Sequence, residues 1–133
     1  MSAFFHQLLQ AAAQQLQPQR LLFVLAAAEL PADASAAQRT AHQRGEGGTL
    51  SPLMCVDKSP AALSSFAALA EEARQAGPPW DLMFVAALSG QGGDEPAQAD
   101  VEAAMKRMVE RIHQGQIDGL LVLDRLGEPV AFV

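Results

Sequence analysis

Two kinds of hydrophobic pattern alternate along this chain: stripes at helical spacing and short, continuously apolar runs. Stripes place apolar residues on one face of a helix, whereas a short continuous run fits a strand that is covered on both faces. Pro52 precedes one of these runs, at a strand start where no backbone donor is needed. The runs predict about five strands, at 21–26, 52–57, 81–88, 119–124 and 129–133.

Helices are predicted by the stripes and by the residues at their ends. Phe5 and Leu16 belong to one stripe, and Pro18 follows it as a stop signal. Ser59 followed by Pro60 is typical of a helix start, because the hydroxyl can cap the first turn and proline fits the first helical position. The predicted helices cover 2–16, 59–76 and 97–114, with a short surface helix near 34–43.

The order of these elements predicts an α/β fold. Strands that alternate with helices favour a parallel sheet, because each helix returns the chain to the same edge. The stretch 124–127 is typical of a turn, so the last strand should run antiparallel beside the fourth. We therefore expect a single α/β domain over 1–133, with one mixed, mostly parallel sheet of about five strands.

Composition narrows the class of protein. The chain has 133 residues, half of them apolar, which suits one domain with a substantial core. Its net charge is −6 and its basic residues are scattered, so we expect no nucleic-acid partner. No apolar run reaches the length of a membrane span, so we expect no membrane partner. The single cysteine excludes an internal disulfide and favours a reducing, cytoplasmic location.

Polar residues follow the predicted strands where a ligand site would form. If the second, third and fourth strands are parallel, their carboxyl ends share one edge, where ligands bind in open α/β sheets. Two predicted helix starts near this edge would favour a small anion or a nucleotide. The alternative is that the same residues are helix caps and turn residues. The candidate ligand-binding residues are Asp57, Lys58, Ser59, Ser89, Gly90, Gly92 and Asp124.

No other residue pattern indicates catalysis. The glycine-rich loop after Ser89 matches neither the dinucleotide fingerprint nor the P-loop. His6, His42 and His113 lie on separate segments without the spacing of metal ligands. Cys55 lies in the middle of a predicted strand and is interpreted as a buried structural thiol. We therefore predict no catalytic residue, no metal and no cofactor.

Three stretches of the chain resemble a small proteobacterial family whose members often carry the label "ribonucleotide reductase subunit alpha". They are 45–60, 80–90 and 124–127, and the resemblance covers nearly the whole chain. As that enzyme is known, its catalytic subunit needs a large barrel and several cysteines, so the resemblance implies at most an accessory role. The opening of the chain is also similar, at the level of the fold, to SseB-type domains.

Taken together, these patterns favour a non-enzymatic binding or accessory module that acts through protein contacts. Self-association as a homodimer is one form of such contact. Two alternatives stay open: an anion- or nucleotide-binding enzyme that uses the predicted ligand edge, and an accessory protein linked to ribonucleotide reductase.

Overall fold

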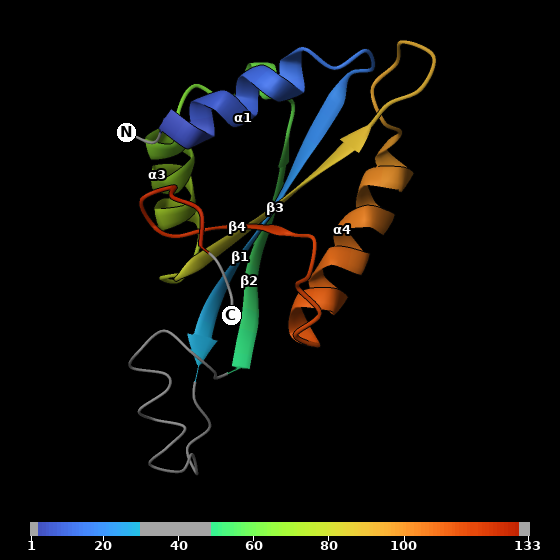
Figure 1. Cartoon of the computed structure of the whole chain (residues 1–133). Coiled ribbons are helices and arrows are strands. Elements are labelled where there is room, and N and C mark those ends of the chain that lie inside the picture. The colour runs from blue at the N-terminus through green and yellow to red at the C-terminus, as the bar shows by residue number, and fades with distance from the viewer. Residues whose placement is uncertain (1–2, 30–48, 131–133) are drawn as a thin grey trace.

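The chain is an α/β protein built around one sheet (Figure 1). The computed structural model describes residues 3–29 and 49–130. The elements in chain order are α1 (Ala3–Ala13), β1 (Gln19–Glu29), β2 (Thr49–Lys58), the short 3₁₀ helix η1 (Pro60–Ala62), α3 (Phe66–Ala76), β3 (Leu82–Ser89), α4 (Gln98–His113) and β4 (Leu121–Leu123).

The sheet differs from the predicted one in direction and order. Its strands lie in the order β2–β1–β3–β4, and each neighbouring pair is antiparallel. β2 and β3 run in the same direction and are joined through α3, but β1 lies between them. This is a split βαβ arrangement, in which an antiparallel strand separates the two strands of the crossover. The prediction of a mostly parallel sheet is therefore wrong.

The cause of this error is visible in β1, the longest apolar run of the sequence. Its side chains alternate between the two faces of the sheet, and both faces are covered. Leu21, Phe23 and Leu25 face one core cluster, whereas Leu22 and Val24 face the other, and all are buried. A continuous apolar run therefore indicates a strand between two helical layers, whatever the direction of its neighbours.

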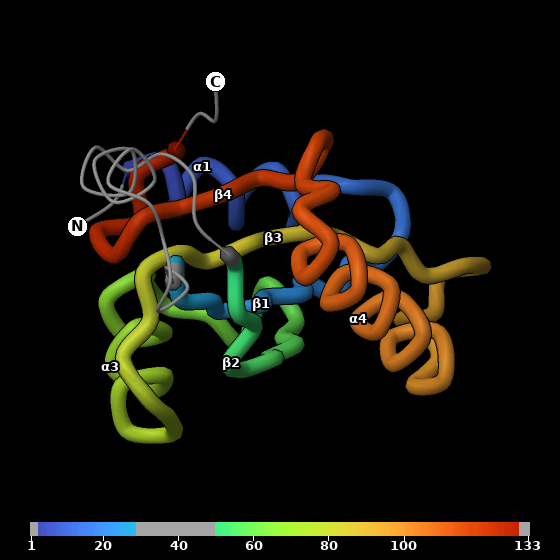
Figure 2. The backbone as a smooth tube through the Cα atoms, turned by 90° about the horizontal axis from the view of Figure 1, so that it is seen from below, coloured from blue at the N-terminus to red at the C-terminus, as the bar shows by residue number. Residues whose placement is uncertain are grey.

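Helices form a layer on each face of the sheet (Figure 2). α1 and α3 cover one face, where the Phe5 and Phe66 rings meet edge to face with centroids 5.5 Å apart. Phe23 of β1 lies beneath them, 6.4 Å from Phe5 between ring centroids. α4 covers the other face, over β1 and β2, and buries Met108 and Ile112.

Over its described residues, 129–130, the predicted fifth strand 129–133 is only a short return of the chain beside β4. After β4 the chain turns, Val130 N donates to Val122 O, and Pro129 forms an isolated bridge with Leu123. The sheet of the described residues therefore has four strands. Residues 131–133 and the predicted surface helix near 34–43 lie outside the described residues.

Two predicted helices have different ends from those expected. α1 ends at Ala13, so Leu16 falls beyond the buried stripe and is 98% exposed. The predicted helix 59–76 is interrupted: Pro60 opens only the three-residue η1, and α3 starts at Phe66. Ser65 is the true cap, because its hydroxyl accepts a hydrogen bond from Ala68 N at 3.1 Å. The helix predicted over 97–114 is confirmed by α4.

Candidate functional site

The sheet brings together only part of the predicted ligand edge. β2 and β3 end on the same side, next to the start of β1, as the pairs Leu21–Lys58 and Gln19–Ser89 show. β4 runs in the opposite direction to β3, so the residue after its last position lies at the other end of the sheet. The residues brought to the shared end are Asp57, Lys58, Ser59, Ser89, Gly90 and Gly92, whereas Asp124 is separated from them.

Even at this shared end, the two charged residues point to opposite faces. The Asp57 carboxylate lies on the α4 side and accepts a hydrogen bond from Arg20 Nε at 2.7 Å. Lys58 Nζ lies on the α3 side, 3.0 Å from Glu72 Oε1. Side chains of successive strand residues alternate between faces, so this separation follows from the strand itself. Asp57 and Lys58 therefore cannot hold one small anion together.

Ser89 and Gly90 at this end are engaged within the fold, and Ser59 is engaged through its backbone. Ser59 precedes η1: its carbonyl accepts from Ala62 N, whereas its hydroxyl makes no cap bond there. The Ser89 hydroxyl accepts a 2.7 Å hydrogen bond from Gln19 Nε2, and Gly90 N donates to Pro18 O at 2.8 Å. A Cβ atom on Gly90 would lie 1.8 Å from the Asp94 carbonyl oxygen, so this glycine is required by close backbone packing.

Gly92 belongs to a tight hairpin turn. Gln91 and Asp94 form a bridge on either side of Gly92 and Gly93, whose φ angles are 62° and 85°. Two central residues with positive φ define a type I′ turn, which favours glycine. The glycine-rich sequence after β3 is explained by this turn.

Asp124 organises the turn that follows β4. Its Oδ1 accepts hydrogen bonds from Leu126 N at 2.8 Å and Glu128 N at 3.0 Å. An aspartate that accepts from the next backbone donors stabilises a turn locally. Asp124 therefore stabilises a turn, at the opposite end of the sheet from the other candidate residues.

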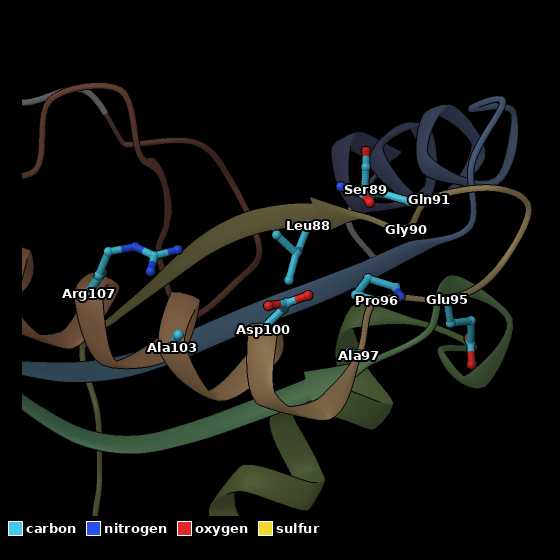
Figure 3. A pocket seen from close by; sticks show the side chains of 10 residues that line it. All are labelled: Leu88, Ser89, Gly90, Gln91, Glu95, Pro96, Ala97, Asp100, Ala103 and Arg107. Atoms are coloured by element: carbon cyan, nitrogen blue, oxygen red, sulfur yellow. The ribbon is translucent and has the colours of Figure 1, made fainter.

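A cavity of about 440 Å³ lies where β3 ends and α4 begins (Figure 3). Asp100 and Arg107 extend from α4 towards Leu88. Ser89 and Gln91 lie on the side of the cavity away from α4. Asp100 occupies the first turn of α4, where the helix dipole favours a negative group. The Asp100 carboxylate therefore lies at a helix start where the sequence predicted a bound anion. The second predicted helix start, at Ser59, opens only η1.

A second, more apolar groove of about 530 Å³ runs between β2 and one side of α4. We call it the β2–α4 groove. β2 is one of the two outer strands of the described sheet and forms one wall, and successive turns of α4 form the other. Its lining residues are Cys55, Asp57, Gln98, Val101, Glu102, Met105, Lys106, Val109 and Glu110.

Side chains of mixed character line this groove. Met105 and Val109 are half-buried, so part of their apolar surface remains open to the groove. Cys55 is exposed, which corrects the expectation of a buried thiol: among the described strands, none lies on the outer side of β2. Its position beside α4 still desolvates the side chain, and this burial raises the pKa of the Cys55 thiol.

The sequence predicted the helix over 97–114 but placed no site on it, so the groove beside Met105 and Val109 was missed. The sequence did carry one indication. The apolar stripe of α4 is wider than the single row of side chains that would face the sheet. Pro52 is a second signal, because proline within a sheet is confined to edge strands, strand starts and bulges. Both become informative once β2 is known to be an outer strand.

The chain matches no protein-family model, no curated protein and no solved structure. The resemblance to the family labelled as a ribonucleotide reductase subunit therefore stays a prediction. Among residues 3–29 and 49–130, no group of histidine, cysteine and acidic side chains could hold a metal ion. Within the same ranges, no helix has the length and apolarity needed to cross a membrane.

Proposed function

We propose that this chain is a binding module that acts through contact with another protein, and that the β2–α4 groove is its contact surface. One observation carries this proposal: half-buried apolar side chains of α4 lie beside an outer strand whose far side has no partner in the described sheet. Unpaired strand edges and open apolar grooves are the features that protein segments recognise.

The polar residues at the sheet ends support this choice over a small-molecule site. Asp57 is paired with Arg20, Lys58 with Glu72, and Ser89 with Gln19. Each of these bonds joins different elements of the fold. A ligand at this end would have to compete with contacts that hold the sheet and its helices together.

Site-specific photocrosslinking in cells that carry the chain natively tests the proposal. A benzophenone amino acid placed at position 105 lies in the groove, whereas the same group at Gln75 lies on the exposed side of α3. We expect a discrete adduct with one other protein at position 105 and none at position 75. Equal labelling at both positions, or no adduct at position 105, would contradict the proposed contact surface.

A further inference from the structure

We propose that the β2–α4 groove receives an extended, basic segment of the partner, which adds as a strand to the outer edge of β2. This inference rests on the proposed function and names the chemistry of the partner. It follows from the strand edge, the apolar wall and the charges of the groove.

The outer edge of β2 is regular over half of its length. Pro52 and a β-bulge opposite Leu25 and Ala26 disturb the first half of the strand. From Met54 to Lys58 the register with β1 is continuous. An added strand can therefore pair with about five residues here, because a regular antiparallel edge presents backbone donors and acceptors at fixed spacing.

The apolar wall of the groove gives such a strand a place for its side chains. Cys55 and Asp57 point towards the α4 side of β2, so alternate side chains of an added strand would point the same way. They would lie against Met105 and Val109 of α4. Methionine adapts to side chains of different shape, so small β-branched residues would fit this wall.

The charges of the groove select a basic segment. Glu102 and Glu110 flank Lys106 along α4, and within the described residues neither glutamate has an ion-pair partner. One lysine can neutralise only one of them, and Asp57 already pairs with Arg20. A second copy of this chain carries a net charge of −6 and would bring further negative charge, which disfavours it as the occupant.

The test uses three labelled octapeptides and the full chain. In the first, the alternate positions that face α4 carry both lysine and valine, and the other positions carry threonine, because Glu102, Met105, Val109 and Glu110 all lie on the α4 side. The second has glutamate in place of each lysine, and the third is the first with N-methyl groups on alternate backbone nitrogens. Fluorescence anisotropy should show that the basic peptide binds at least about tenfold more tightly than either of the others, and less tightly at high salt. Hydrogen exchange should slow, when the basic peptide is bound, at those amides within Met54–Lys58 that point away from β1.

A matched pair of variants tests the charge argument. Removing both groove carboxylates with Glu102→Gln and Glu110→Gln should weaken binding of the basic peptide roughly fivefold, because two exposed ion pairs are lost. The control variant carries Glu95→Gln and Asp118→Asn, which lower the charge by the same amount outside the groove. Its affinity should equal that of the unmodified chain.

Several outcomes would overturn the inference. They are equal binding of the acidic peptide, unchanged binding of the N-methylated peptide, and an equal loss in both double variants. Light scattering that shows a dimer, with the outward-pointing amides of Met54–Lys58 already protected without peptide, would assign the groove to a second copy. If position 105 crosslinks to a partner while the basic peptide fails to bind, the proposed function stands and this inference falls.

Discussion

Cys55 makes the β2–α4 groove accessible to a simple chemical measurement. The thiol is exposed on the outer strand, yet desolvation beside α4 raises its pKa. The thiolate is the reactive form, so a raised pKa lowers its fraction at every pH below that pKa. The folded chain should therefore react with iodoacetamide more slowly near neutral pH than the same chain in denaturant.

The pH profile separates this effect from simple shielding. Between about pH 7 and pH 11, the rate for the folded chain should reach its midpoint at a higher pH than the rate for the denatured chain. Shielding alone would lower the plateau and leave the midpoint unchanged. A midpoint at or below that of the denatured chain would contradict the environment assigned to Cys55.

Individual residues show how far the candidate site could be predicted. Ser89 and Gly90 were recognised as residues that follow a strand, and both line the cavity beside α4. The role of Ser89 could not be read from the sequence, because its partner Gln19 lies 70 residues away along the chain. The role of Gly90 depends on the following turn, which brings the Asp94 backbone back against it. Asp124 was placed at the wrong end of the sheet because the direction of its strand was wrong.

The start of α3 gives a test at the level of one helix. Ser65→Ala removes the hydroxyl that accepts from Ala68 N, and it should lower the free energy of unfolding by about 1 kcal/mol. Ser59→Ala is the matched control, because its side chain makes no cap bond at η1, and it should change stability by less than about 0.5 kcal/mol. Urea denaturation measures both. A larger loss of stability for Ser59→Ala than for Ser65→Ala would contradict this assignment and favour a helix that starts at Ser59, as the sequence predicted.

Elements with a strong local signal were predicted well, and their connections were not. The stripe of α4 and the apolar runs of β1, β2 and β3 lie close to where they were expected. The order of the strands was missed because β1, covered on both faces, has the same pattern as a strand of a parallel sheet. Nothing local in β1 indicates that it lies between β2 and β3, since that depends on packing across the whole sheet.

For the molecule as a whole, the split arrangement has a direct functional consequence. With β1 between β2 and β3, β2 becomes an outer strand, and α4 lies beside it on one face. The β2–α4 groove exists only in this arrangement. If β2 paired with β3 instead, as adjacent parallel strands, its register and its free edge would both change.

Cross-strand nuclear Overhauser effects in the isotope-labelled chain test this arrangement most directly. The backbone of Phe23 should show contacts to Val56 on one side and to Val85 on the other, because these residues are its register partners in β2 and β3. Direct backbone contacts between β2 and β3, with Phe23 outside the pair, would contradict the strand order and remove the groove on which the proposed function depends.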